Sequence, residues 1–474
     1  MALSSVWRVL TFLTTKETRM NGSALVGATA RVAVVGAGPS GLYAVKALLE
    51  SDVGVGIDVF DSLPAPYGLV RYGVAPDNQK MKSVIRVLRG SFTEGNDVRF
   101  LGNVTFGEDI TAAELRAYYD AVIYATGTQG DRGLGIPGEE LPGSYGAKEF
   151  VNWYCGHPDA AERDFALHGP EVAVVGAGNV ALDVARLLAK STEEIAATDV
   201  PDRVLGTFSS STVTDIHLLS RRGPAQAKFT TVELREMGEL ANADILIDPG
   251  ALELTPEEEE RIAADRQQRK NVSLLREWAQ RPPEGKPRRL HLWFWRSPVR
   301  IIGENHIDGV VIERNALQAD GTLRGTGEYE TLPVSMILAA VGYQARALPG
   351  VPFDEHTNTV PNKNGCVLEA EGTPRPGEYV AGWAKRGPTG VIGTNKNDAA
   401  ETVDNLLDDL NDLRNKGRDS SRDVTKLLRQ RGIDYVDWAG WLRLDTHETT
   451  LGEQQNRPRV KIPDLLSMLE FTRK

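Results

Sequence analysis

Residues 32–41 read Val-Ala-Val-Val-Gly-Ala-Gly-Pro-Ser-Gly, and this stretch decides the fold class. The β-branched run predicts a buried strand, and three glycines in the spacing G-x-G-x-x-G predict a tight turn into a helix. Gly36 permits the turn, Gly38 lets the backbone approach a pyrophosphate, and Gly41 lets the helix pack closely on the strand. The stretch therefore predicts a dinucleotide site with the phosphates at the N-terminus of that helix.

A carboxylate stands where such a unit needs a partner for the ribose. Asp61 ends the predicted strand 57–61, about 20 residues after the glycines, and an acidic side chain there accepts hydrogen bonds from ribose hydroxyls. The unit closes with a strand at 121–125, followed by the small residues Thr126 and Gly127. A Gly-rich loop in any α/β protein is the alternative, but the order of strand, helix, second strand and carboxylate favours a dinucleotide.

The same signal repeats at residues 171–181, which read Glu-Val-Ala-Val-Val-Gly-Ala-Gly-Asn-Val-Ala. Two such units imply two dinucleotides, or one dinucleotide and a decayed copy of the site. The next strand, 215–219, ends in Ser220, Arg221 and Arg222 without a carboxylate, and two guanidiniums can fork onto a 2′-phosphate. The second site is therefore expected to prefer NADP over NAD, the alternative being that the paired arginines only form a solvated strand end.

Composition limits the class of protein and its compartment. The chain has 474 residues, enough for two or three domains, and its Lys+Arg count of 54 against Asp+Glu 65 gives a net charge of −11. This balance argues against a nucleic-acid binder. Only Cys155 and Cys366 occur, which excludes a disulfide framework and a four-cysteine iron–sulfur cluster, and no metal site is predicted. No segment reaches transmembrane length.

Three further segments carry weaker signals. Residues 1–30 are rich in Ser and Thr and poor in acidic residues, so we expect a disordered extension, or Met20 as the true initiator, and a cytoplasmic protein. A transit peptide, with a location in the mitochondrial matrix, is the alternative. Residues 292–295, Leu-Trp-Phe-Trp, predict a core strand rather than a stacking platform, and residues after about 415 read as polar helices without a predicted role.

Four longer stretches resemble one family. They are residues 67–77, the run Gly-Asn-Val-Ala-Leu-Asp-Val-Ala-Arg at 178–186, Arg-Arg-Gly-Pro at 221–224, and Lys-Arg-Gly-Pro-Thr-Gly-Val-Ile at 385–392. On these stretches the chain resembles the adrenodoxin-reductase type of ferredoxin–NADP reductase over nearly its whole length from about Arg31. The resemblance implies FAD on the first unit, NADP(H) on the second, and a ferredoxin-type iron–sulfur protein as the electron acceptor.

The resemblance also implies which residues hold each cofactor. FAD would be held by Gly36, Gly38, Ser40, Gly41, Asp61, Leu69, Phe106, Trp383, Gly390, Val391 and Ile392. NADP would be held by Ala177, Gly178, Asn179, Val180, Arg221, Arg222, Glu233, Gly390 and Arg132.

Asn78 and Glu236 are the candidate catalytic residues. The family often has His after the Ala-Pro-Asp run near the flavin, where this chain has Asn78, so a proton relay at that position is in doubt. Glu236 lies in the matching Glu-Leu-Arg-Glu run and is a polar candidate near the nicotinamide. Hydride transfer depends more on stacking geometry than on an acid or base, so the loss of the histidine need not abolish activity.

The expected architecture is α/β with two Rossmann-like dinucleotide-binding domains in a glutathione-reductase-like layout. An FAD domain is expected at residues 31–128 and 340–474, with an NADP domain inserted at 129–339. The resemblance implies an enzyme that passes electrons from NADPH through FAD to a ferredoxin, one electron at a time.

Two other functions remain open on the sequence. One is the NADPH-oxidising flavoprotein subunit of a larger complex, as in glutamate synthase, although such subunits usually bring their own cysteine-ligated clusters. The other is a non-catalytic dinucleotide-sensing module. If the partner is an acidic ferredoxin, docking is expected to be transient and electrostatic, through local basic residues such as Lys228, Arg235, Arg296 or Arg300.

Overall fold

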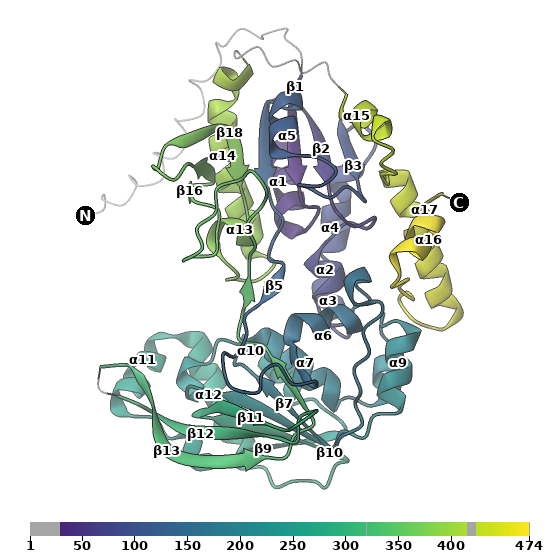
Figure 1. Ribbon diagram of the computed structural model, residues 1–474. Helices are drawn as coiled ribbons and strands as arrows, with labels where there is room; N and C mark the ends of the chain where they lie inside the picture. Colours follow the sequence, from purple (N-terminus) through teal and green to yellow (C-terminus); the bar gives the residue numbers. More distant parts are fainter. Residues whose placement is uncertain (1–28, 319, 415–422, 474) are drawn as a thin grey trace, which may run out of the picture.

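The computed structural model describes residues 29–318, 320–414 and 423–473, and it contains two α/β units that lie one above the other in Figure 1. One is built on a seven-stranded sheet and the other on a six-stranded sheet, and we call them the seven-stranded unit and the six-stranded unit. Two Rossmann-like units were predicted, and this prediction is confirmed. Of the predicted extension, residues 1–28 lie outside the described ranges.

The first glycine motif lies at the centre of the seven-stranded sheet, whose order is β16-β17-β18-β4-β1-β2-β3. Its strands are β1 (Ala30–Val35), β2 (Val55–Phe60), β3 (Val98–Leu101), β4 (Ala121–Tyr124), β16 (Asn362–Lys363), β17 (Cys366–Leu368) and β18 (Pro374–Val380). β1 pairs in parallel with both β2 and β4. Such a central strand is covered on both faces, which explains its unbroken apolar run.

Helices cover this sheet and add a C-terminal layer. They are α1 (Pro39–Leu49), α2 (Leu69–Tyr72), α3 (Gln79–Lys82), α4 (Ile85–Arg89), α5 (Ala112–Tyr118), α13 (Trp383–Arg386), α14 (Thr394–Arg414), α15 (Val424–Gln430), α16 (Trp438–Gln454) and α17 (Leu465–Arg473), with a 3-10 turn η1 (Gly90–Phe92). α1 and α14 pack on each other, with α1 against β1 and β2 and α14 against β18 and β4. Trp441, Leu444 and Met468 bury α16 and α17 in the same core.

The second glycine motif lies in the six-stranded sheet, whose order is β6-β14-β7-β8-β10-β9 and whose neighbouring strands all pair in parallel. The strands are β6 (Ser144–Gly146), β7 (Glu171–Val175), β8 (Asp215–Ser220), β9 (Ala243–Ile247), β10 (Arg288–Phe294) and β14 (Met336–Ala339). The predicted core strand at 292–295 is thus the end of β10, except that Trp295 lies outside it.

One face of this sheet is covered by helices and the other by a small antiparallel sheet. The helices are α6 (Ala147–Tyr154), α7 (Asn179–Ala189), α8 (Thr192–Ala196), α9 (Asp202–Ser209), α10 (Thr231–Met237), α11 (Pro256–Ala264) and α12 (Arg266–Trp278), with 3-10 turns η2 (Pro158–Ala160), η3 (Pro224–Gln226) and η4 (Pro249–Leu252). The small sheet contains β11 (Arg296–Ile302), β12 (Gly309–Leu317) and β13 (Leu323–Leu332). Val310 and Ile312 of β12 share a core with Val175 and Leu219.

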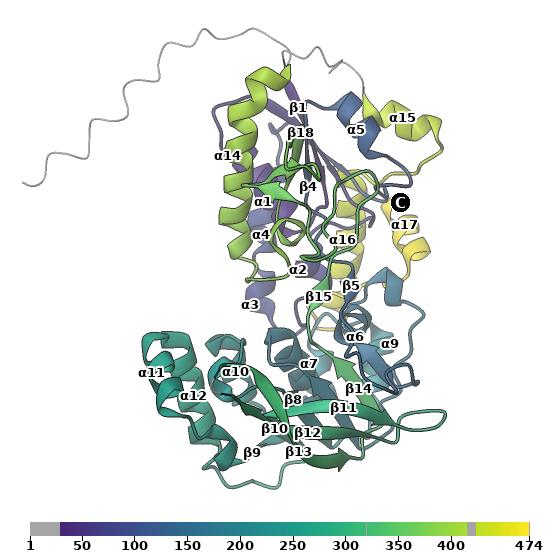
Figure 2. The same ribbon diagram turned by 60° about the vertical axis from the view of Figure 1, so that its left-hand side comes forward.

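The chain crosses between the units twice, and the two crossings lie side by side (Figure 2). They are β5 (Gly130–Asp131) and β15 (Tyr343–Gln344), which pair antiparallel. The six-stranded unit is therefore inserted between two parts of the seven-stranded unit. Within the described ranges, no helix is both long and apolar enough to span a membrane.

Candidate functional site

Steric contact at the first glycine turn leaves no room for a side chain at Gly36 or Gly41. Gly36 has φ +109°, and a Cβ there would lie 2.5 Å from the carbonyl oxygen of Ala125. A Cβ on Gly41 would lie 1.9 Å from the carbonyl oxygen of Gly36, because the helix starts against the turn. Around Gly38, by contrast, the nearest atom to such a Cβ is 3.9 Å away, at Gly68. The turn is therefore crowded at Gly36 and Gly41 and open at Gly38, where the protein backbone can approach a pyrophosphate.

The helices that follow the two glycine motifs begin without a side-chain cap. Gly38 is the N-cap of α1 and Gly178 that of α7, and neither helix has a side-chain hydrogen bond to its first turn. Elsewhere in the described chain, α5, α8 and α11 begin with complete capping boxes at Thr111, Ser191 and Thr255. The open N–H groups of α1 and α7, with the positive end of each helix dipole, fit a pyrophosphate.

Asp61 follows β2 and lies beside the first turn. Its carboxylate accepts hydrogen bonds from the N–H of Ala37 (2.8 Å) and of Leu63 (3.0 Å). Burial raises the pKa of Asp61 to about 6, and the two backbone hydrogen bonds act in the opposite direction. A carboxylate fixed in this way keeps further lone pairs for hydroxyl donors.

The loop at 67–69 folds back over the turn. Tyr67 has φ +83°, and its N–H donates to the carbonyl of Ala37 at 2.8 Å. A Cβ on Gly68 would lie 2.9 Å from the Cα of Gly38, so the two glycines meet backbone to backbone. Leu69 then begins α2. The loop therefore holds Leu69 close to the first glycine turn.

The remaining residues predicted to hold FAD are Ser40 in α1, Phe106 after β3, and Trp383 and residues 390–392 before α14. Ser40 donates to the side-chain oxygen of Asn395 at 3.0 Å, which joins the N-terminal ends of α1 and α14 across 355 positions. Trp383 starts α13, and its ring centroid lies 5.6 Å from that of Tyr343 at the crossing. Gly390 has φ +82° and precedes Val391 and Ile392 in the turn before α14. The ring centroid of Phe106 lies 5.5 Å from that of Tyr124.

The second glycine turn repeats the first. Gly176 has φ +150°, and a Cβ there would lie 2.4 Å from the carbonyl oxygen of Ala340, whereas a Cβ on Gly178 would meet nothing within 4 Å. Asn179 accepts from the N–H of Thr230 at 2.8 Å, and the carbonyl of Ala177 accepts from the N–H of Lys228 at 2.8 Å. Residues 228–230 are thereby tied to the turn. Val180 follows in the first turn of α7.

Arg221 and Arg222 have a fixed main chain and exposed side chains. The carbonyl of Arg222 accepts from the hydroxyl of Ser220 at 2.8 Å and from the N–H of Trp295 at 3.3 Å. The carbonyl of Arg221 accepts from the amide of Asn315 at 2.9 Å. Two exposed guanidiniums on a fixed backbone suit an anionic ligand group such as phosphate, because each planar guanidinium can donate two hydrogen bonds to its oxygens.

Trp295 and Asn315 were not found from the sequence. Trp295 has φ +60°, an unusual conformation for a bulky residue, so it leaves the strand that the sequence predicted for it. Asn315 is buried on β12 and also donates to the hydroxyl of Ser297 at 2.7 Å. Only the strained backbone and the burial of an amide, both properties of the folded chain, reveal their role in holding the arginine pair.

Asn78 and Glu233 meet across the boundary between the units. The Asn78 amide donates to the buried carboxylate of Glu233 at 3.4 Å, and Asn78 also caps α3 by accepting from the N–H of Met81. Two candidate site residues from different motifs, 155 positions apart in the sequence, are therefore in direct contact.

A buried guanidinium, Arg186 of α7, organises the carboxylates around this contact. It binds Asp77 through two nitrogens, at 2.9 and 3.0 Å, and it lies 3.4 Å from Glu233 and 3.0 Å from Glu236. Burial and the neighbouring Glu233 raise the pKa of Glu236, and burial raises the pKa of Asp183 to about 7. Arg186 ends one of the stretches that carry the family resemblance, but no role was predicted for it, because the sequence does not show that its side chain is buried.

Arg132 lies at the crossing. Its N–H donates to the carbonyl of Gly342 at 3.0 Å, directly after β5. Gly342 lies two residues after Ala340, whose carbonyl packs against Gly176, so Arg132 lies beside the crossing and near the second glycine turn. Among the described residues, no group of three or more His, Cys, Asp or Glu is arranged to hold a metal ion.

These features define a class: a pyridine-nucleotide-dependent oxidoreductase with two dinucleotide-binding units that meet at one polar boundary. The family model described as pyridine nucleotide-disulphide oxidoreductase matches residues 30–223. NADPH-ferredoxin reductase FprA of Mycobacterium leprae is 41% identical over 452 residues, covering 93% of this chain and 98% of that protein. NADPH:adrenodoxin oxidoreductase, mitochondrial, of Arabidopsis thaliana is 38% identical, covering 91% and 93%.

A solved structure matches as well. Mycobacterium tuberculosis FprA in complex with NADPH superimposes with a TM-score of 0.89 at 40% identity, over 94% of this chain and 100% of that one. The chain belongs to the NADPH–ferredoxin reductase family that includes NADPH:adrenodoxin oxidoreductase. The resemblance found in the sequence is confirmed, and neither alternative function is favoured by these relatives.

Proposed function

We propose that this protein is an enzyme that transfers electrons from NADPH through FAD to a ferredoxin-type iron–sulfur protein. The observation that carries the proposal is the contrast between the two glycine turns. Asp61 follows the strand beside the first turn, and Arg221 and Arg222 follow the corresponding strand beside the second. A carboxylate favours a ribose with a free 2′-hydroxyl and repels a 2′-phosphate, whereas guanidiniums do the reverse.

FAD is therefore assigned to the seven-stranded unit, with the domain division 31–128 plus 340–474, and NADP to residues 129–339. When bound, FAD supplies the chemistry of accepting a hydride from NADPH and releasing electrons singly to a one-electron acceptor. The residues proposed for FAD are Gly36, Gly38, Ser40, Gly41, Asp61, Leu69, Phe106, Trp383, Gly390, Val391 and Ile392. Those proposed for NADP are Ala177, Gly178, Asn179, Val180, Arg221, Arg222, Glu233, Gly390 and Arg132.

Side chains at the boundary hold polar groups rather than move protons. The Asn78 amide does not titrate near neutral pH, so it cannot act as a general acid or base, and it donates a hydrogen bond to the carboxylate of Glu233. Arg186 fixes Glu233 and Glu236 from the other side. We propose that these residues orient the ligand at the boundary, because hydride transfer is governed by alignment of the two reacting groups.

The relatives named for ferredoxin and adrenodoxin support an iron–sulfur protein as partner. We propose that it docks transiently on the surface of α10 and the segment before it, where Val232 and Arg235 of the helix and the preceding Lys228 are exposed. An apolar side chain between two cations suits an acidic surface with an apolar centre. Arg300 is exposed on β11, whereas Arg296 is half-buried over the ring of Trp293 and is a poorer candidate.

A cytoplasmic location is proposed, with the mitochondrial matrix as the alternative, since a plant relative is named as mitochondrial. The function is tested on the purified yellow protein under anaerobic conditions. Addition of NADPH should bleach the flavin absorbance, and addition of oxidised ferredoxin should restore it with stoichiometric ferredoxin reduction. A protein that binds NADPH without bleaching would support the sensing module instead.

A further inference from the structure

The two units are joined by very little covalent structure. The crossings β5 and β15 contain two residues each. If FAD lies on one unit and NADP on the other, as proposed above, the distance between their reacting rings depends on how the units are oriented. Side-chain contacts across the boundary must therefore set that orientation.

The connection between α16 and α17, residues 455–464, supplies such contacts. It belongs to the seven-stranded unit, yet Arg457 reaches the connection between α8 and α9 in the other unit. The guanidinium donates to the carbonyls of Thr198 (3.0 Å) and Val200 and to the carboxylate of Asp202 (2.6 Å), and its side chain is 3% exposed. A planar fork on three separate acceptors fixes an orientation as well as a distance.

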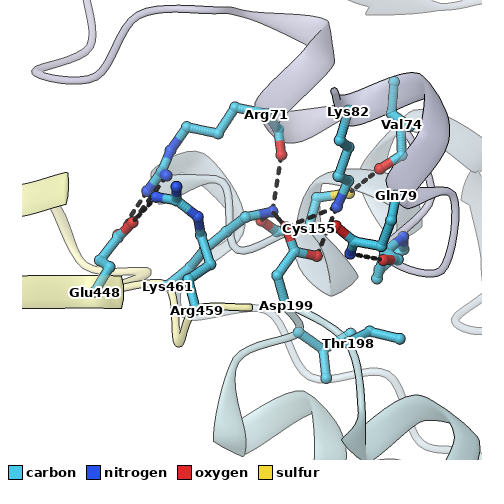
Figure 3. Close-up of polar contacts among 12 residues, drawn as sticks. Arg71, Val74, Gln79, Lys82, Cys155, Thr198, Asp199, Glu448, Arg459 and Lys461 are labelled. Carbon is cyan, nitrogen blue, oxygen red and sulfur yellow. Dashed lines mark hydrogen bonds and ion pairs between the residues drawn. The ribbon is translucent and has the colours of Figure 1, made fainter. Parts of the chain in front are cut away.

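Lys461 makes the second set of contacts, shown in Figure 3. Its ammonium donates to the carbonyl of Arg71 at 2.8 Å and to the carbonyl of Cys155 at 2.9 Å, and it lies 3.2 Å from the carboxylate of Asp199. Arg71 belongs to the seven-stranded unit, and Cys155 and Asp199 belong to the six-stranded unit. Lys82 of α3 binds the same Asp199 at 2.6 Å. One buried ammonium thus holds the main chains of both units at one point.

The base of this connection is firmly tied to the loop over the first glycine turn. Arg71 donates two hydrogen bonds to the fully buried carboxylate of Glu448, at 2.8 and 2.6 Å. Glu448 also accepts from Arg459 at 3.1 Å and from the N–H of Ile462 at 3.0 Å. Any displacement of residues 455–464 would therefore be passed to Arg71, two residues after the proposed flavin contact Leu69.

Burial of these charges is costly. Burial lowers the pKa of Lys461 to about 8, and the attraction of Asp199 only partly opposes it. A buried ionic cluster contributes little stability relative to apolar packing of the same volume. Apolar contact is non-directional, however, whereas hydrogen bonds to fixed carbonyls accept one arrangement.

We propose that Arg457 and Lys461 form a clamp that fixes the six-stranded unit against the seven-stranded unit, and that they are positioning residues for hydride transfer. The proposal rests on the proposed function, because it needs the two cofactors on different units. A misplacement of about 1 Å costs roughly 100-fold in rate, so a loosened clamp should be visible in the hydride-transfer step.

The test uses the holoenzyme with Lys461→Met, which leaves the Lys82–Asp199 pair in place, and with Arg457→Lys, which keeps the charge but loses the fork. We expect flavin reduction at saturating NADPH to slow by about 10-fold or more, with the NADPH dissociation constant changed less than about twofold. Amide hydrogen exchange at residues 196–202 should rise, and the long-wavelength absorbance of the complex with NADP⁺ should weaken.

Arg99→Met is the matched control. Arg99 binds the buried Asp58 at 2.6 Å inside the seven-stranded unit, so its loss should lower the melting temperature without slowing flavin reduction. If Lys461→Met fails to fold, Arg457→Lys decides. Flavin reduction at the wild-type rate, or a changed dissociation constant with an unchanged limiting rate, would overturn the clamp. A wild-type protein that NADPH does not reduce would instead overturn the proposed function.

Discussion

The side-chain amide of Asn315 donates a hydrogen bond of 2.9 Å to the carbonyl oxygen of Arg221, 94 positions earlier in the chain. Asn315 is buried on β12, in the small sheet that covers one face of the six-stranded unit. The small sheet therefore does more than fill a core, because it holds the backbone of the arginine pair that is proposed to read the 2′-phosphate.

Asn315→Asp should weaken NADPH binding while sparing NADH. A carboxylate cannot donate to the Arg221 carbonyl, and an unsatisfied buried group costs about 1–3 kcal/mol, which corresponds to roughly a 10-fold rise in KM for NADPH. Ser297→Ala is the control, since it removes the other partner of Asn315 without touching Arg221. Equal losses with both coenzymes, in steady-state assays of each, would contradict this role.

Asp61→Ala should loosen FAD. One lost hydrogen bond to a charged group is worth about 1.5–3 kcal/mol, so the dissociation constant for FAD should rise by about 10-fold or more. Asp109→Ala removes a carboxylate that accepts from the N–H of Thr105 at 2.7 Å in a turn of the same unit, and it should not release FAD. Full flavin occupancy of Asp61→Ala after extensive dialysis, read from absorbance, would reject the ribose assignment.

The buried Lys461 should give the folded protein a distinctive pH dependence. Its pKa is lowered to about 8 in the folded state by burial, with Asp199 opposing and Lys82 adding to the effect, while the unfolded chain has a lysine pKa of about 10.4. Between these values the unfolded chain binds more protons, so the free energy of unfolding rises with pH. The adjacent Cys155 thiol, whose pKa burial raises from 9.0 to about 11, acts in the opposite direction from about pH 9 upward, and it is present in both proteins compared below.

From pH 7 to pH 9 the free energy of unfolding of the wild type should therefore rise relative to that of Lys461→Met. Groups common to both proteins, such as Asp183, cancel in the difference. Urea unfolding of the two proteins at three pH values measures it. Parallel profiles would show that Lys461 keeps an ordinary pKa.

Arg235→Glu should weaken docking of the iron–sulfur partner. Opposite charges attract most at low ionic strength, so KM for ferredoxin should rise several-fold at low salt and converge with the wild type as salt screens the interaction. Arg324→Glu, an exposed reversal on β13, should leave this KM unchanged. A turnover rate at limiting ferredoxin that does not change with ionic strength would count against electrostatic docking.

Local patterns predicted the parts of the fold that local chemistry determines. The G-x-G-x-x-G spacing located Gly36, Gly41 and Gly176. Gly41 packs within its own turn, whereas the carbonyls of Ala125 and Ala340 that crowd Gly36 and Gly176 come from far along the chain. The contacts of Ser40 with Asn395 and of Asn78 with Glu233 join residues 355 and 155 positions apart, and only the folded chain shows them.

Buried charges were the main omission. Arg186, Arg457 and Lys461 look in the sequence like any solvated cation, because their burial is decided by elements far along the chain. The polar C-terminal helices were expected to have no particular role, and the connection between two of them instead supplies the clamp. A charged residue is buried only where partners are prepared for it, and those partners cannot be read from spacing.

The central proposal is that Asp61 selects FAD for the first site and that Arg221 and Arg222 select NADP for the second. It is tested most directly by kcat/KM for NADPH and NADH on the wild type and on Arg221→Ala with Arg222→Ala. Charge-assisted hydrogen bonds of roughly 1.5–3 kcal/mol each predict a wild-type preference for NADPH of about 100-fold or more. The double variant should lose most of it through a higher KM for NADPH, with NADH turnover and bound FAD almost unchanged. A ratio that barely moves would show that the 2′-phosphate is read elsewhere and that the second site is wrongly assigned.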